Sequence, residues 1–352
     1  VFYVDGDYRA SVPPGEYTLV LSRGPEYRLV RRTLTVRSGE TTAIGIALER
    51  WIDMPARGWY SADDHVHIER ANQSVNAGIS AFLRAEDVHL ANLLEMTNIT
   101  NRHYRQYAFG PRGRHRQGDY ALVPGQESPR TSHLGHTIGL NAGALHVNPE
   151  RYYLYEEIAR AVREDGGMWG YAHAALDAFH LGRGLALDVP MGLVDFMEVL
   201  QLNTLNTSHL YDFLNMGFAV LPSAGSDFPY MHVPGAERIY ARLDKPFTVD
   251  NWFDAWRNNR SFVSNGPVIT FNVNGDTTAT RFDVAAGEPV EILAQVSVNP
   301  DLDTIDRLEL VRHGEVIATA VASAGGESVQ LEHGFEAGQS VGQQRRGAAQ
   351  RR

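Results

Sequence analysis

The chain has 352 residues, 43% of them hydrophobic and 21% charged, which is enough for two or three domains with a sizeable core. Its net charge is −10 and it carries no basic stripe, so nucleic-acid binding is not expected. Cysteine is absent and Lys245 is the sole lysine. This excludes thiol nucleophiles, thiolate metal sites and disulfides, and it argues against Schiff-base or P-loop chemistry.

No apolar run is long enough to cross a bilayer, so no membrane span is expected. The sequence begins at Val1 in a strand-like run. If a signal peptide has been removed, a secreted or periplasmic location is favoured over a cytoplasmic one. Composition leaves the oligomeric state open.

Residues 1–54 are predicted to form an accessory β-domain. The turn Pro13-Pro14-Gly15-Glu16 precedes a strand-like run over residues 17–21, and similar runs cover residues 27–36 and 42–48. Short strands separated by Pro and Gly are typical of a small β-sandwich. We therefore expect a packing role for this segment and place the chemistry elsewhere.

Residues 55–267 alternate between strand-like and helix-like patterns. Strands are expected at 59–68, 90–96, 120–127, 134–140, 168–172, 193–200 and 218–222, and helices at 74–88, 149–164, 208–216 and 248–257, with a long polar loop at 101–117. This alternation predicts an α/β barrel of parallel strands, with the functional residues at the carboxyl ends of the strands.

The last part of the chain changes character again. Residues 268–334 contain short strand-like runs with an Asn274-Gly275 turn, which predicts a second β-sandwich domain. Residues 335–352 are rich in Gln, Gly, Ala and Arg without periodicity, and are predicted to be a disordered tail.

A His-x-His pair lies in the first barrel strand. Because alternate residues of a strand share a face, Asp63, His65 and His67 are expected to project together. Further polar residues follow on later strands, and strand ends converge at the mouth of a barrel. The candidate metal ligands are His65, His67, Glu127, His136, His173 and Asp227.

Four imidazoles and two carboxylates suit Zn, Mn or Fe. Six protein ligands are too many for one catalytic ion that keeps an open position, so two divalent ions are expected, with one carboxylate between them. His89 is a further possible ligand.

These motifs, in this order, resemble the PHP (polymerase and histidinol phosphatase) superfamily of metallohydrolases. The matching segments are Asp63-Asp64-His65-Val66-His67, Pro124-Gly125-Gln126-Glu127, Gly135-His136, Tyr171-Ala172-His173 and Gly225-Ser226-Asp227. The segments around Glu86-Asp87-Val88-His89 and Gly125-Gln126-Glu127-Ser128-Pro129-Arg130-Thr131 are similar to a carbaryl-hydrolase-like branch.

The resemblance implies a distorted (β/α)7 barrel between the two β-sandwiches. It implies that His65, His67 and Asp227 hold one ion, that His136 and His173 hold a second, and that Glu127 bridges the two. Histidines typical of the family's third metal site are missing, because Glu95-Met96-Thr97-Asn98 and Phe228-Pro229 stand at those places. The expectation is therefore two ions.

The expected activity is hydrolysis of an ester, amide or carbamate bond in a small molecule. Asp227 or Asp63 is a candidate for proton transfer, although orientation of a ligand histidine is the favoured role for Asp63. His133 or His232 is a candidate for assisting the leaving group, and Arg130 for binding a charged substrate group. Phosphoester hydrolysis at the same centre is the alternative, and a non-enzymatic binding protein is a third reading. A G-x-S-x-G motif is absent, which disfavours a serine hydrolase.

Overall fold

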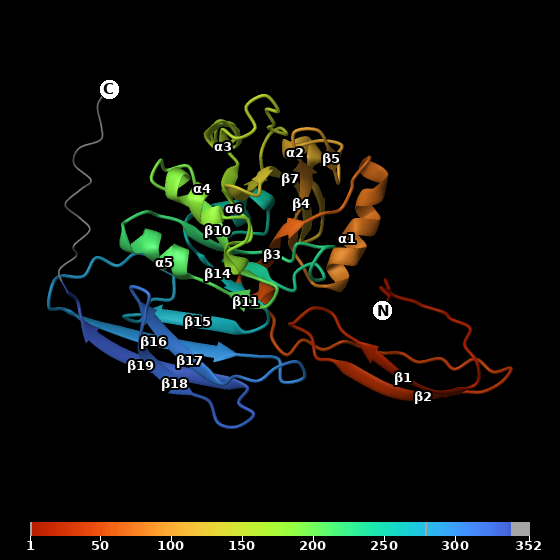
Figure 1. Cartoon of the computed structure of the whole chain (residues 1–352). Helices are drawn as coiled ribbons and strands as arrows, with labels where there is room; N and C mark the ends of the chain where they lie inside the picture. Colours follow the sequence, from red (N-terminus) through yellow and green to blue (C-terminus); the bar gives the residue numbers. More distant parts are fainter. Residues whose placement is uncertain (1, 279, 339–352) are drawn as a thin grey trace.

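The computed structural model describes residues 2–278 and 280–338, and it shows an N-terminal hairpin, a central α/β unit and a C-terminal β unit (Figure 1). The hairpin consists of β1 (Gly15–Leu21) and β2 (Val30–Val36), paired antiparallel. Neither strand has a buried side chain, and residues 42–48 form no strand. The described part of this segment therefore forms a two-stranded sheet and not the predicted sandwich. Neither face of the sheet carries buried side chains against which a second sheet could pack.

Twelve strands of the described chain form the central sheet. They are β3 (Trp59–Val66), β4 (Leu90–Thr97), β5 (Arg102–His103), β6 (His115–Gln117), β7 (Tyr120–Thr131), β8 (Gly135–Leu140), β9 (Met168–Tyr171), β10 (Phe196–Gln201), β11 (Thr204–Leu205), β12 (Leu221–Ala224), β13 (Arg238–Arg242) and β14 (Ser261–Ser264).

The main order of this sheet is β11-β10-β9-β8-β7-β4-β3-β13-β14, with β12 beside β10, β5 beside β4 and β6 beside β7. Strands β3, β4 and β7 are parallel, as are β9, β10 and β12. Strand β8 is antiparallel to both β7 and β9, so strict strand–helix alternation is not kept there. The sheet curls, since Phe228, just after β12, forms a bridge with Val66 at the end of β3.

The helices pack around this sheet (Figure 1). They are α1 (Asn76–Ala85), α2 (Gly110–Gly113), α3 (Tyr155–Glu164), α4 (Leu181–Asp188), α5 (Ser208–Asn215) and α6 (Val249–Arg257). Helix α6 buries Trp252, Phe253 and Trp256 in the main core together with the strand residues Leu90 and Phe196. The expected loop at 101–117 in fact contains β5, α2 and β6. No described helix is long and apolar enough to cross a membrane.

The C-terminal unit has two small sheets. One holds β15 (Val268–Val273), β16 (Pro289–Ser297) and β19 (Ser328–Glu336), and the other holds β17 (Arg307–Arg312) and β18 (Glu315–Val321). Val296 and Leu331 from the first sheet pack with Leu308 from the second. Strand β19 extends to Glu336, so the disordered tail was predicted to begin too early, at residue 335. The last part of that predicted tail, residues 339–352, lies outside the described chain.

Candidate metal centre

The six predicted ligands lie in one buried cluster at one edge of the central sheet. They come from the end of β3, the middle of β7, the start of β8 and the residues just after β9 and β12, and none of the six is more than 8% exposed: His65, His67, Glu127, His136, His173 and Asp227. His136 begins an antiparallel strand. The start of β8 reaches the same edge as the ends of its neighbours for that reason.

His65, His67 and Asp227 form the first group of candidate ligands. The two Nε2 atoms lie 3.2 Å apart, and Oδ1 of Asp227 lies 3.4 Å from Nε2 of His65 and 3.5 Å from that of His67. Ligand atoms bound tetrahedrally at 2.0–2.1 Å from a zinc ion are about 3.3 Å apart. The spacing of this group therefore fits one divalent cation.

The other ring nitrogen of each of three histidines is anchored by an acceptor. Nδ1 of His65 faces Glu198 Oε1 at 3.1 Å, Nδ1 of His67 faces the Leu94 carbonyl at 3.1 Å, and Nδ1 of His173 faces Gln201 Oε1 at 2.9 Å. A hydrogen on each Nδ1 leaves a lone pair on each Nε2. Two acceptors 3.2 Å apart repel each other, so the pair His65–His67 needs a cation or a proton between its nitrogens.

Glu127 lies between the two sets of histidines. Its Oε2 is 3.5 Å from Nε2 of His67, and its Oε1 is 3.7 Å from Nε2 of His173 and 2.8 Å from Nδ1 of His136. Although Oε1 of Glu127 and Nδ1 of His136 are close to each other, neither atom has a partner in hydrogen-bond geometry within the described chain. Together with His65 and His173, Glu127 forms a second group with metal-binding spacing. His65 thus belongs to both groups.

The electrostatics of the cluster favour a cation. Burial opposes charge on His65, yet the carboxylates of Asp227 and Glu198 outweigh it and hold its pKa well above the usual value. Burial would raise the pKa of Glu127, but His136, His173 and Arg130 hold it well below its usual range. The pKa of Asp227 is lowered in the same way, mainly by His65 and His67 against burial. Both carboxylates are therefore ionised and available as ligands.

Two acids occupy places that the sequence did not predict. Glu198 directly contacts His65 and also accepts a hydrogen bond from the His173 main-chain nitrogen. Asp64 lies beside Glu198, and burial together with that neighbouring carboxylate raises the pKa of Asp64 well above normal. Asp64 and Glu198 are both fully buried.

Asp63 does not face the ligand cluster as the strict alternation of a strand predicted. The pairing of β3 with β4 shifts register between Asp63 and Val66, which breaks the alternation. The Asp63 carboxylate accepts hydrogen bonds from the main-chain nitrogens of His65, Ser226 and Gly235 and from the Ser226 hydroxyl. Burial raises its pKa to about 6, against the effect of these donors. Asp63 thus fixes the loop that carries Asp227.

Three other histidines named from the sequence lie apart from the ligand groups. His133 is exposed in the turn between β7 and β8. His89 is buried near the start of β4, where Nδ1 lies 2.9 Å from the Ser61 hydroxyl and its ring stacks on Tyr120. His232 contacts Glu237 through Nδ1 at 2.8 Å. None of the three belongs to either group in the described residues.

Aromatic rings and one arginine border the cluster. Tyr104 and Tyr230 lie with ring centroids 5.1 and 5.8 Å from that of His67, and their hydroxyls are hydrogen-bonded. Phe179 stacks on His136, with the two ring centroids 4.0 Å apart. Arg130 places Nε 3.3 Å from Glu127 Oε2, and its side chain is 24% exposed.

Sequence reasoning missed Phe179, Tyr230, Glu198 and Gln201 as parts of this site. Glu198 and Gln201 had a usable signal, because both are polar residues in the otherwise apolar, fully buried strand β10. Phe179 and Tyr230 stand in loops whose conformation no periodic pattern predicts.

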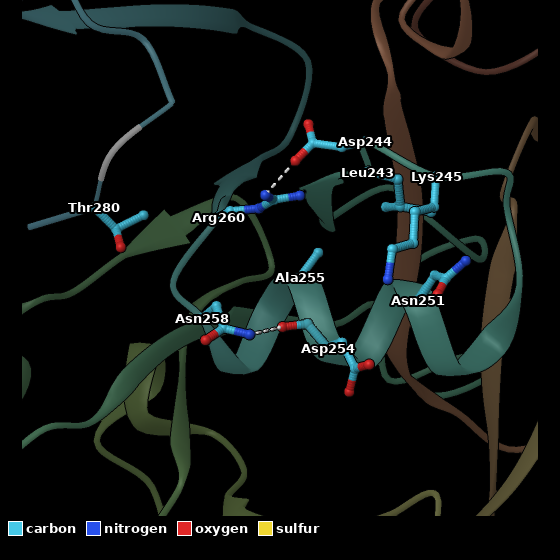
Figure 2. A pocket seen from close by; sticks show the side chains of 9 residues that line it. All are labelled: Leu243, Asp244, Lys245, Asn251, Asp254, Ala255, Asn258, Arg260 and Thr280. Atoms are coloured by element: carbon cyan, nitrogen blue, oxygen red, sulfur yellow. Dashed lines mark hydrogen bonds and ion pairs between the residues drawn. The ribbon is translucent and has the colours of Figure 1, made fainter.

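A separate polar cavity of about 650 Å³ lies beside α6 (Figure 2). It is lined by residues from α6 and its flanking segments, including the Asp244–Arg260 ion pair and Lys245. None of the candidate ligands lines it, and its charged groups have mixed signs. This cavity is therefore distinct from the metal-ligand cluster.

Comparison with known proteins finds no protein-family model and no curated protein that matches the chain. Among solved structures, the chain is similar to a two-domain protein from Bacteroides vulgatus described as containing a predicted PHP-like metal-dependent phosphoesterase. The identity is 11% and the TM-score 0.44, over 80% of this chain and 87% of that one.

Two further solved structures show a weaker likeness. PsfC from Pseudomonas syringae has 14% identity and a TM-score of 0.38 over 59% of this chain and 91% of that one. The lesion-specific endonuclease PfuEndoQ from Pyrococcus furiosus has 15% identity and a TM-score of 0.36 over 56% of each chain. At these TM-scores the likeness carries no functional inference, which depends instead on the geometry of the cluster.

Proposed function

We propose that this chain is a metal-dependent hydrolase that cleaves an ester, amide or carbamate bond of a small molecule. The observation that carries the proposal is the close approach of imidazole nitrogens and ionised carboxylates in one buried cluster, where a cation or a proton is needed between them. Nε2 of His65 and Nε2 of His67 lie 3.2 Å apart, and Asp227 completes a triangle with them. Such a donor set fits Zn, Mn or Fe.

The ligands divide into two sets in this proposal. His65, His67 and Asp227 would hold one ion, His136 and His173 would hold a second, and Glu127 would be a ligand shared by the two. Divalent cations supply Lewis acidity, which polarises a carbonyl and makes water acidic enough to react near neutral pH.

The chain's own residues then bind and orient the substrate. The aromatic rings of Tyr104, Tyr230 and Phe179 provide apolar surface on two sides of the histidines, which suits an apolar group next to the scissile bond. Arg130 is near enough to Glu127, and exposed enough, to donate to a substrate oxygen at the mouth. Asp227 is ionised and able to accept a proton.

Phosphoester hydrolysis is the second candidate, and Arg130 is the observation that favours it. Its Nε is buried against Glu127, but the side chain is 24% exposed, and a guanidinium group at the border of the cluster suits an anionic phosphate. The aromatic surface around His67 and His136 favours the first candidate, because a phosphate gains nothing from apolar rings.

One assay series separates these functions. The protein is loaded with Zn²⁺ or Mn²⁺, or stripped with a chelator, and tested on aryl ester, aryl carbamate, phosphomonoester and phosphodiester substrates. Ester or carbamate turnover that disappears on chelation and returns with metal is the expected result. Turnover that survives chelation contradicts the metal mechanism, and chelator-sensitive phosphatase activity alone selects the second candidate. Absence of turnover together with absence of bound metal favours a non-enzymatic binding protein.

A further inference from the structure

Glu198 is placed where three ligand-bearing segments meet. Its Oε1 lies 3.1 Å from Nδ1 of His65 near the end of β3, and its Oε2 accepts a 2.6 Å hydrogen bond from the main-chain nitrogen of His173 after β9. The third segment, which leads to Asp227, passes so close that a methyl group added at Gly225 would lie 2.6 Å from Oε1 of Glu198. The side chain is fully buried.

The two contacts of Glu198 serve different ligand groups. His65 belongs to both groups, and its Nε2 points into the cluster only while Nδ1 keeps its hydrogen toward Glu198. His173 belongs to the second group, and its backbone is held in the left-handed region with φ of 62°. A non-glycine residue in that region is strained, so the hydrogen bond from its nitrogen helps to hold the strained conformation.

We propose that Glu198 is a positioning residue that fixes both ligand groups at once, so that its loss weakens the binding of both cations. This inference rests on the proposed metal-dependent function. Gln201, on the same strand, contacts only Nδ1 of His173 in the cluster, at 2.9 Å. Gln201 is therefore assigned to the second group alone.

The carboxylate is essential to this role because it faces two donors. A glutamine at position 198 has one oxygen and one amide nitrogen, and the nitrogen can accept from neither the His65 ring nor the His173 main chain. One donor is left unpaired, or the His65 ring changes tautomer and turns a hydrogen toward the cluster. Removing such supporting contacts typically lowers metal affinity about 10- to 100-fold.

The test is calorimetric titration of metal-free protein with Co²⁺, together with the absorption spectrum of the bound ion. Wild type is expected to show two binding steps. Glu198→Gln should weaken both steps about 10- to 100-fold, whereas Gln201→Leu should weaken one. The matched control is Asp195→Asn, since Asp195 is a partly buried acid that accepts a hydrogen bond from the Trp169 main-chain nitrogen and contacts no histidine of the cluster.

Binding of both ions by Glu198→Gln within about threefold of wild type overturns the proposal, as does weakening of only the step that Gln201→Leu affects. If Glu198→Gln fails to fold by circular dichroism, Glu198→Asp takes its place. The aspartate keeps the charge but is one methylene shorter, so weakening of both steps supports the proposal, whereas unchanged binding or weakening of only the step that Gln201→Leu affects overturns it.

The titration is independent of the proposed reaction. Wild type that binds two Co²⁺ ions but hydrolyses no substrate refutes the hydrolase and leaves the positioning role standing. Chelator-sensitive hydrolysis together with unaltered binding by Glu198→Gln refutes the positioning role alone. A wild-type protein that takes up no Co²⁺ refutes both.

Discussion

Two buried clusters of charged and polar groups lie at opposite ends of the same strands. The metal-ligand cluster lies at the carboxyl ends of β3 and β9. The second, which we term the basal cluster, lies where β3, β4 and β7 begin and consists of Glu26, Arg50, Asp87, His89 and Tyr120.

The two clusters differ in how their charges are matched. In the basal cluster Arg50 contacts Glu26 at 2.6 Å and Asp87 at 2.9 Å, Tyr120 donates to Asp87, and His89 contacts the Ser61 hydroxyl. In the metal-ligand cluster Nε2 of His65 and Nε2 of His67 face each other at 3.2 Å, and a cation or a proton is needed between them. Buried charge alone therefore does not identify a metal site. Several potential ligand atoms that face one another without paired donors are a better indication.

The largest expected effect is on the metal-ligand cluster. His65→Ala removes a proposed ligand of the first ion whose side chain also lies in the second group, so metal content should fall. Activity should drop by about 1,000-fold or more, given several kcal/mol of transition-state stabilisation at 1.36 kcal/mol per tenfold. Elemental analysis and the hydrolysis assay measure this. His146→Ala is the control, since His146 pairs with Asp165 beside α3 and should leave metal content unchanged. Full metal content in His65→Ala would mean that the groups are assigned wrongly.

Removal of the basal histidine should have the opposite profile. His89→Ala leaves a cavity in a buried site and removes the ring contact with Ser61, so the free energy of unfolding should fall by about 2–4 kcal/mol. Metal content should not change. Urea denaturation measures the free energy of unfolding, and elemental analysis measures the metal content. Loss of metal without loss of stability would contradict the assignment of His89 to a structural cluster.

The basal cluster should also give a pH signature. Burial lowers the pKa of His89 to about 4, below its usual value, so the folded protein resists a proton that the unfolded chain accepts. The stability from neutral His89 is complete above pH 6.5 and is lost as the pH falls toward 4, by roughly 3 kcal/mol in total. Glu26 acts in the opposite sense, because burial and Asp87 raise its pKa to about 7.

The measurement for His89 is therefore the difference between wild type and His89→Ala in urea denaturation from pH 4 to pH 7. That difference should grow as the pH rises. A constant difference would show that His89 is as easily protonated in the folded protein as in the unfolded chain.

The smallest effect is expected at the aromatic border of the metal-ligand cluster. Tyr230→Ala removes one ring beside His67 without touching a ligand, so KM should rise roughly two- to twelvefold for an aromatic substrate, from a ring contact worth about 0.5–1.5 kcal/mol. Metal content and kcat should stay near wild type. A large fall in kcat would place Tyr230 in the chemistry itself.

The sequence was informative where side-chain placement follows from regular structure. Residues expected at strand ends do lie in one cluster, because parallel strands bring their ends to one edge. The same reasoning failed at Asp63, where a register shift in β3 overrides alternation. It also failed for the N-terminal sandwich, since local patterns predict strands but not whether a second layer exists to cover them.

The contacts that distinguish the two histidine environments could not be read from the sequence. Both His89 and His65 have an aspartate two residues before them, and each lies in or next to an expected strand. Only the fold shows that His89 contacts Ser61 and Tyr120, whereas His65 contacts another candidate ligand, His67. Pairings between residues far apart in the chain, such as His65 with Glu198, depend on the curl of the sheet.

Arg50 and Glu26 belong to the N-terminal segment, yet they complete the base of the central unit: Arg50 binds Asp87, and the Tyr240 hydroxyl on β13 donates to Glu26. The segment therefore cannot be excised or exchanged as an independent module. A cut after residue 54 would strip Asp87 of its arginine, and an uncompensated buried charge of this kind costs about 3–5 kcal/mol. Recombination of this segment between proteins would have to move Glu26 and Arg50 together with the acid and the tyrosine that receive them.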